Sequence, residues 1–129
     1  MLQYTWDHIH LRSPDPEATA KYYERMFGAE IIRTLQQGKP RIDLKLGGAN
    51  IFIAPVPAGS NVNPPPVTPY QGLDHFGLTI KGGSLDALAI ELRAKGAVFT
   101  TEPHTARPGV RVCFIRGPEG VSIEIIERG

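Results

Sequence analysis

The chain has 129 residues with 14 basic and 13 acidic side chains, so its formal net charge is +1. The length predicts one compact domain, and the balanced charge argues against nucleic-acid binding. A composition of 41% hydrophobic residues without an apolar run of about 20 residues excludes a disordered chain and a membrane-spanning helix. Cys113 is the single cysteine and cannot form an internal disulfide. With no signal-peptide pattern at the start, we expect a cytoplasmic protein.

The first half of the chain is predicted to begin with a strand and a helix. Alternating apolar and polar side chains over residues 6–12 are typical of a strand. Asp15 and Pro16 predict a helix start, as N-cap and first helical residue, and Gly28 is placed to end the helix. Two further strands are expected at residues 41–46 and 50–55.

The second half repeats the same order of signals. A strand at residues 73–80 is followed by a helix that begins after Ser84 and ends at Gly96. Strands are then expected at residues 110–115 and 121–126, after a loop at residues 100–109. The agreement extends to single residues, because the string Asp-His-x-x-Leu occurs at residues 7–11 and again at residues 74–78.

A proline-rich stretch separates the two halves. Six of the twelve prolines lie between Pro55 and Pro69, where they remove the amide donors that a helix or central strand needs. We therefore expect an α+β fold within a single domain, residues 1–129, built from two tandem βαβββ modules. Module one covers residues 5–56, the connector residues 57–72 and module two residues 73–127.

These paired modules, their Asp-His-x-x-Leu openings and the closing string Gly-Pro-Glu-Gly-Val-Ser-Ile-Glu-Ile at residues 117–125 resemble the vicinal oxygen chelate superfamily. That superfamily includes glyoxalase I, methylmalonyl-CoA epimerase, fosfomycin-modifying transferases, extradiol dioxygenases and bleomycin-resistance binding proteins. The resemblance covers nearly the whole chain, from about residue 5 to 127. It implies that the modules form a mixed, curved sheet around a metal or ligand cleft.

The resemblance implies a metal site made of His8, His75 and Glu124. A carboxylate on the sheet face opposite Ile123 and Ile125 is costly to bury unpaired, and a divalent cation would neutralise it. Two imidazoles and one carboxylate suit one divalent ion of iron, zinc, nickel, manganese or cobalt. Taken singly, each of the three is more often an ordinary polar strand residue; together, at the superfamily's positions, they favour the metal.

The position of a fourth ligand does not match. Many members of the superfamily supply Glu or Gln from the last strand of the first module. Counted from the turn glycines, that position is Phe52, or Ile51 if the register shifts by one residue, and neither can bind a metal. This departs from glyoxalase-like and epimerase-like sites and resembles the three-ligand sites of extradiol dioxygenases and fosfomycin-modifying enzymes.

Other polar residues are candidates for chemistry or substrate binding. His10 should face the same way as His8 and could act as general acid or base, or could hydrogen-bond a neighbouring strand. Arg12 matches a carboxylate-binding position of glyoxalase-like members and could instead be an exposed strand-end charge. Tyr70 and Arg107 are the polar residues expected beside the cleft.

The polar residues Arg41, Asp43 and Lys45 alternate along one strand, as in a cavity wall or a solvated outer face.

The leading functional hypothesis is a metal-dependent enzyme that chelates neighbouring oxygens of a small-molecule substrate for lyase or isomerase chemistry. The alternatives are an extradiol-type dioxygenase and a non-catalytic binder of the bleomycin-resistance kind. We also expect a homodimer, as is common in the superfamily, and a structural role for Cys113 in the core.

Overall fold

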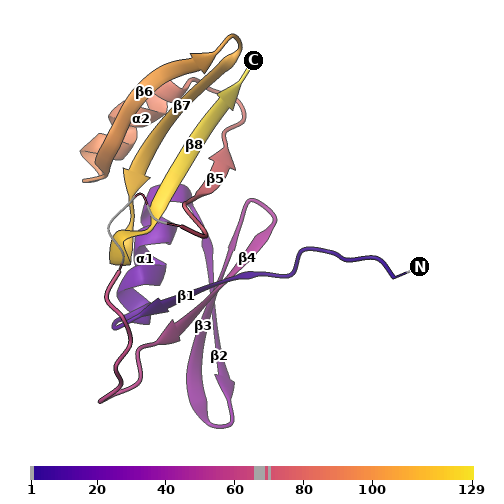
Figure 1. Ribbon diagram of the computed structural model, residues 1–129, viewed down its shortest axis with the longest axis vertical. Helices are drawn as coiled ribbons and strands as arrows, with labels where there is room; N and C mark the ends of the chain where they lie inside the picture. Colours follow the sequence, from indigo (N-terminus) through magenta and orange to yellow (C-terminus); the bar gives the residue numbers. More distant parts are fainter. Residues whose placement is uncertain (1, 66–68, 70) are drawn as a thin grey trace. The chain divides into compact units, whose positions relative to one another are not determined.

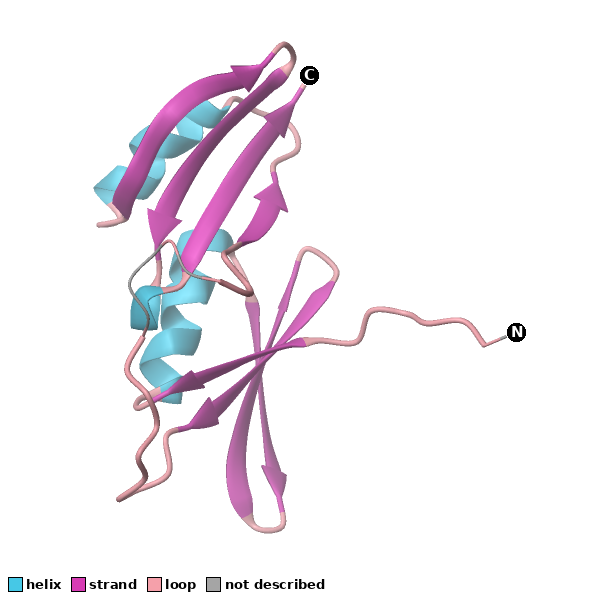
Figure 2. Ribbon diagram, in the orientation of Figure 1, coloured by secondary structure: helices cyan, strands magenta, loops and turns pink. Residues whose placement is uncertain are grey.

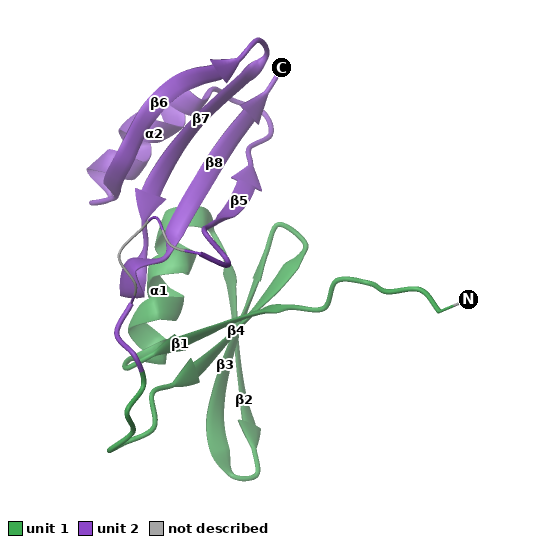
Figure 3. Cartoon of the chain, viewed as in Figure 1, with its two compact units in different colours: residues 1–62 green, residues 63–129 purple. Residues whose placement is uncertain are grey.

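The computed structural model describes residues 2–65, 69 and 71–129. The chain divides into two compact units, residues 1–62 and residues 63–129 (Figure 3). Each unit contains one α-helix and four strands in the order βαβββ, which confirms the predicted α+β class and the internal repeat. Within the described ranges, no helix is both long and apolar enough to cross a membrane.

Each unit forms one four-stranded mixed sheet (Figures 1 and 2). The strand order is β1-β4-β3-β2 in unit 1 and β5-β8-β7-β6 in unit 2, so the two sheets share one topology. The first strand of each unit runs parallel to the last, and the other neighbours are antiparallel. The elements of unit 1 are β1 (Ile9–Ser13), α1 (Pro16–Phe27), β2 (Glu30–Gln36), β3 (Lys39–Leu46) and β4 (Ala49–Pro55). Those of unit 2 are β5 (Phe76–Thr79), α2 (Leu85–Ala94), β6 (Val98–Arg107), β7 (Val110–Arg116), the short 3-10 helix η1 (Pro118–Gly120) and β8 (Ser122–Arg128).

Both helices begin where the sequence predicts. Asp15 caps α1 by accepting a hydrogen bond from the amide of Ala18, and Pro16 takes the first helical position. Gly28 ends α1 in the left-handed conformation, at φ 70°, which a residue without a Cβ adopts at low cost. Ser84 caps α2 in the same way, through the amide of Ala87. Local capping chemistry therefore fixes both helix starts.

One face of each sheet is covered by the helix of its own unit. In unit 1, Leu44, Ile51 and Ile53 are buried on the face toward α1. In unit 2, Cys113, Ile115, Ile123 and Ile125 are buried on the face toward α2. Because successive strand residues point to opposite faces, the residues between these core positions lie on the other face of each sheet.

Cys113 belongs to the core of unit 2, as the sequence analysis expected. Its side chain is fully buried, and burial raises the pKa of the thiol to about 11. The thiolate, which is the nucleophilic form, is therefore scarce at neutral pH. Cys113 packs as a small apolar side chain rather than serving as a nucleophile.

Two strands were not located from the sequence. Residues 100–109 were expected to be a loop, but they lie in β6 and the turn that follows it. β6 is an edge strand with register shifts around Thr101 and His104, and Pro103 is tolerated in such an irregular edge. β2 was not predicted either, because its turn to β3 places Gln37 at a positive φ of 52°, which glutamine rarely adopts. The opening strands are also shorter than expected, since β1 begins at Ile9 and β5 at Phe76.

Candidate functional site

The two histidines of the repeated string occupy equivalent places. His8 directly precedes β1 and His75 directly precedes β5. In each unit the preceding aspartate holds the imidazole: His8 Nδ1 lies 2.5 Å from Asp7 Oδ2, and His75 Nδ1 lies 2.7 Å from Asp74 Oδ2. An ionised carboxylate only accepts hydrogen bonds, so Nδ1 is the donor in both histidines, and a neutral ring then presents a lone pair at Nε2.

In unit 2 that lone pair faces a carboxylate. His75 Nε2 lies 3.3 Å from Glu124 Oε1, and their side chains are 32% and 19% exposed. With the proton at Nδ1, two electron-rich atoms meet at this distance, which is unfavourable unless a positive charge lies between them. A proton or a metal ion would supply that charge. Bonds of about 2.0–2.2 Å from one ion to both atoms place the two ligands about 3 Å apart, so the pair fits a metal.

The strand registers identify the counterpart of Glu124 in unit 1. Glu124 pairs with Gly77 of β5, and the equivalent residue of β1, His10, pairs with Phe52 of β4. Phe52 therefore stands where unit 2 has its carboxylate, as the count from the turn glycines predicted. Ile51, the other residue considered, is buried on the helix side. No ligand comes from this position.

Phe52 is the centre of an aromatic cluster in unit 1. The rings of His8 and Phe52 stack with centroids 4.1 Å apart and an interplanar angle of 24°. His10 meets Phe52 edge-on at 6.4 Å, and the Arg41 guanidinium lies 4.5 Å from the centre of the Phe52 ring. The cluster orients the His8 ring by stacking in addition to its hydrogen bond with Asp7.

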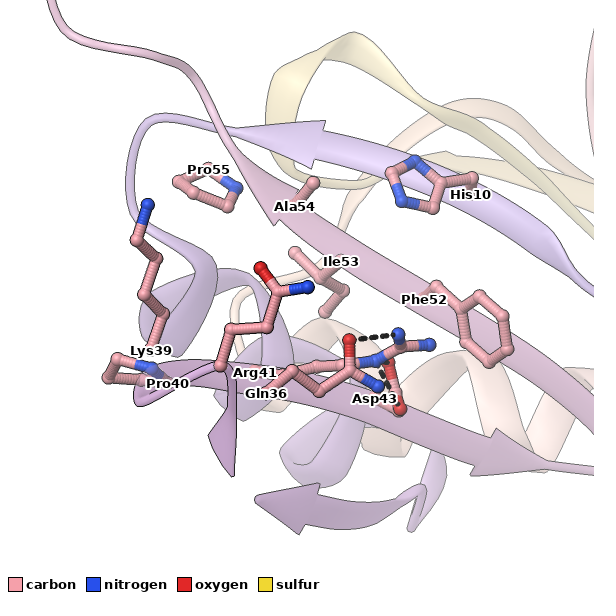
Figure 4. A pocket seen from close by; sticks show the side chains of 11 residues that line it. His10, Gln36, Lys39, Pro40, Arg41, Asp43, Phe52, Ile53, Ala54 and Pro55 are labelled. Carbon is pink, nitrogen blue, oxygen red and sulfur yellow. Dashed lines mark hydrogen bonds and ion pairs between the residues drawn. The ribbon is translucent and has the colours of Figure 1, made fainter. Parts of the chain in front are cut away.

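A cavity of about 610 Å³ opens on this face of unit 1 (Figure 4). It combines charged and amide side chains with apolar ones. The lining residues are His10, Gln36, Gln37, Lys39, Pro40, Arg41, Asp43, Phe52, Ile53, Ala54 and Pro55. Arg41 and Asp43 thus form part of a cavity wall, whereas Lys45, the third residue of the alternating pattern, is exposed and is not among the lining residues.

His10 is the histidine that lines the cavity. Partial burial lowers the pKa of its imidazole below the usual value, and the cationic side chains of Arg12 and Arg41 lower it further. The neutral ring, able to accept a proton, is therefore the form favoured at neutral pH. Arg12 donates from Nη1 to the carbonyl oxygen of Pro55 at 2.7 Å, so part of its guanidinium is engaged by the backbone.

The remaining candidates lie elsewhere or outside the described residues. Arg107 is at the end of β6, next to the β6–β7 turn, and pairs with Val110. Val110 is four residues along β7 from Phe114, the register partner of Glu124. Tyr70 lies outside the described residues. The described part of the chain holds no group of three or more histidine, cysteine or carboxylate side chains placed to bind one ion. What the structure brings together is His75 with Glu124 in unit 2, and His8 with His10 in unit 1.

Sequence reasoning did not select Arg41, Gln36 and Lys39 as site residues. Arg41 Nε donates to both oxygens of Asp43 at 3.0 and 3.1 Å, and Nη1 donates to Gln36 Oε1 at 2.9 Å. The signal for Arg41 was its alternation with Asp43. Gln36 and Lys39 could be found only by locating β2 and its turn.

Comparison with known proteins gives a consistent result. A family model described as the Glyoxalase/Bleomycin resistance protein/Dioxygenase superfamily matches residues 5–125. A lactoylglutathione lyase of Arabidopsis thaliana is 26% identical over 95% of this chain, and a putative lactoylglutathione lyase of Brassica oleracea is 27% identical over the same share. The chain spans 44% of the length of each of these plant relatives.

Solved structures share the fold at low sequence identity. A glyoxylase/bleomycin resistance protein/dioxygenase domain from Frankia has a TM-score of 0.76 at 19% identity, covering 99% of this chain and 100% of that chain. A fosfomycin resistance protein from Listeria monocytogenes has a TM-score of 0.74 at 17% identity, covering 99% and 96% respectively.

Proposed function

Because the chain belongs to the Glyoxalase/Bleomycin resistance protein/Dioxygenase superfamily, we propose that it is a metal-dependent enzyme acting on a small molecule with two neighbouring oxygen atoms. His8, His75 and Glu124 would hold one divalent ion. When bound, such an ion polarises the substrate oxygens as a Lewis acid and stabilises negative charge that develops on them.

The observation that carries the proposal is the contact between His75 Nε2 and Glu124 Oε1. With Nδ1–H donated to Asp74, the two facing atoms need a positive charge between them, and a divalent metal ion would supply it. Aspartate or glutamate behind a metal-binding histidine is a common arrangement, since it fixes the tautomer and raises the basicity of the ligand. Asp7 repeats this arrangement behind His8.

In this proposal His10 moves the proton, and an arginine side chain anchors a negative group of the substrate. His10 lines the cavity in its neutral form and can accept a proton from a carbon next to a polarised carbonyl group. Lyase or isomerase chemistry is the leading class, and the two plant relatives are named lactoylglutathione lyases. Lactoylglutathione is therefore the first compound to test.

The His10→Ala variant tests the chemical step. It is expected to retain metal and to lose about 100- to 10,000-fold in kcat toward lactoylglutathione, which is the usual contribution of a general acid or base. Turnover is followed through the thioester absorbance, with the metal content of each sample measured in parallel. The matched control is His104→Ala, because His104 lies on β6 and bonds only the Glu102 backbone among the described residues. Equal activity in the His10→Ala variant and the wild-type protein would remove the assigned role.

Phe52 favours a second candidate, an extradiol-type ring-cleaving dioxygenase. With Phe52 at the fourth position, only three protein ligands remain, and three ligands with open positions are the pattern of non-haem iron oxygenases. Iron as the bound metal would favour this candidate over lyase chemistry. The homodimer and the cytoplasmic location expected from the sequence remain predictions.

A further inference from the structure

The cavity of unit 1 contains an arginine that is held in place before any ligand binds. Arg41 Nε donates to Asp43 and Nη1 donates to Gln36. The guanidinium also lies over the Phe52 ring in a cation–π contact. These contacts come from three different strands, and Figure 4 shows Arg41 lying between Gln36 and Asp43. Such a guanidinium loses little side-chain entropy when it binds a further acceptor.

The same contacts leave part of the guanidinium available. Nε–H is used by Asp43 and one Nη1–H by Gln36, whereas Nη2 has no hydrogen-bond partner among the described residues. Nη1 therefore keeps one N–H group and Nη2 keeps two. Two N–H groups of a planar guanidinium match the two oxygens of a carboxylate, which they can bind through parallel hydrogen bonds.

The charged and apolar side chains that line the rest of the cavity favour an organic anion as its ligand. The cavity is lined by two cations, Lys39 and Arg41, and by one anion, Asp43, so its formal charge is positive. Phe52, Ala54 and Pro55 add an apolar surface on β4 (Figure 4). An inorganic anion would gain nothing from that surface, whereas the carbon skeleton of an organic acid would bury apolar area against it.

We propose that this cavity binds a small organic carboxylate, with Arg41 as its bidentate anchor and Phe52, Ala54 and Pro55 against its apolar part. This inference names a substrate class for the proposed function. Binding of the carboxylate is independent of that function, and only its identification as the substrate rests on it. Arg41 then takes the anchoring role for which the sequence suggested Arg12. Arg12 donates to the carbonyl of Pro55 and is not among the residues that line the cavity.

The test uses the untagged 129-residue chain stripped of metal with EDTA, so that it is independent of the metal proposal. Benzoate, benzamide and inorganic phosphate are titrated by NMR, with the side-chain Nε–H signals of the arginines observed. Benzoate is expected to bind saturably and to shift the Arg41 signal. Benzamide lacks the charge and phosphate lacks the apolar part, and each is expected to bind at least about tenfold more weakly.

Three variants locate the anchor. Arg41→Gln is expected to weaken benzoate binding at least about tenfold, and Arg41→Lys, which keeps the charge but loses the fork, to weaken it as well. Arg33→Gln is the matched control, since Arg33 lies on the opposite face of the same sheet and pairs with Glu17 of α1. It should bind benzoate as the wild type does.

The backbone NMR spectrum of each variant establishes that it is folded. Unchanged benzoate binding in a folded Arg41→Gln or Arg41→Lys variant would overturn the proposal, as would equal affinity for benzamide or tighter binding of phosphate. Loss of binding in Arg12→Gln with retention in Arg41→Gln would move the anchor to Arg12 and would also overturn it. A protein that binds benzoate in this way but never binds metal would support this inference and contradict the proposed function.

Discussion

The Glu124→Gln variant is expected to bind a divalent metal ion more than about a hundredfold more weakly than the wild-type protein. Substitution of groups behind the ligands of a metal site already costs about 10- to 100-fold in affinity, and Glu124 is proposed as a ligand itself. The amide has the same shape, so the fold is retained. The substitution also removes the negative charge that faces His75 Nε2.

The measurement is a competition titration with a chromophoric chelator on metal-free protein, using zinc as the probe. Glu102→Gln is the control, because it removes the same charge from a residue that pairs with Arg93 at the surface of unit 2. Asp74→Asn should fall between the two, at about 10- to 100-fold weaker binding, because it leaves the ligands in place and loosens the His75 ring. Equal zinc affinity in Glu124→Gln and Glu102→Gln would show that Glu124 is not a ligand.

The Leu44→Ala variant is expected to lose about 2–5 kcal/mol of free energy of unfolding. Leu44 lies on β3 with no exposed surface, on the sheet face toward α1, and its register partners are Ile31 and Ile51. Removing the side chain leaves a cavity under the helix in addition to the lost burial of apolar area. The effect is large because the neighbouring strands and helix prevent the site from collapsing.

Leu35→Ala supplies the matched control for this loss. Leu35 is in the same sheet, on β2, but its side chain is 72% exposed, so the identical substitution should change stability by no more than about 0.5 kcal/mol. Urea unfolding followed by far-ultraviolet circular dichroism measures both. A Leu44→Ala variant as stable as Leu35→Ala would contradict the placement of Leu44 in the core of unit 1.

The sequence predicts those parts of the fold that depend on local chemistry. Asp15 and Ser84 fix the helix starts by accepting hydrogen bonds from amides three positions on, and Pro16 takes the first position of α1. Gly28 ends α1 by adopting a positive φ. Such signals lie within a few residues of one another, so they can be read from the chain. The repeat is also visible, because two copies of one module retain the Asp-His-x-x-Leu string.

The strands β2 and β6 were harder to predict, because both are edge strands whose side chains are largely exposed. β6 carries Pro103 and an irregular register, and β2 ends at a turn without the usual Asn-Gly or Asp-Gly pair. Neither strand shows the apolar alternation that marks a half-buried strand. Missing β2 also hid the contact of Gln36 with Arg41, and with it one wall of the cavity.

For the candidate site, the repeat predicts which positions of the two halves are equivalent, but not which side chains touch. Matching the halves gives His8 with His75 and Phe52 with Glu124, and the registers bear out the second pair. The 3.3 Å contact of His75 with Glu124 and the stacking of His8 on Phe52 depend on side-chain conformations that no spacing in the sequence determines. The same holds for the hydrogen bonds that orient Arg41.

The central claim is that His8, His75 and Glu124 hold one divalent ion, and elemental analysis of the untagged protein by plasma mass spectrometry tests it most directly. The His8→Ala variant is measured alongside, after both proteins have been reconstituted with each candidate metal and dialysed. The proposal predicts close to one metal ion per chain in the wild type and its loss in His8→Ala. No metal in the wild type after reconstitution, or equal metal in both proteins, would contradict the claim; the first result would leave a small-molecule binding protein as the better description.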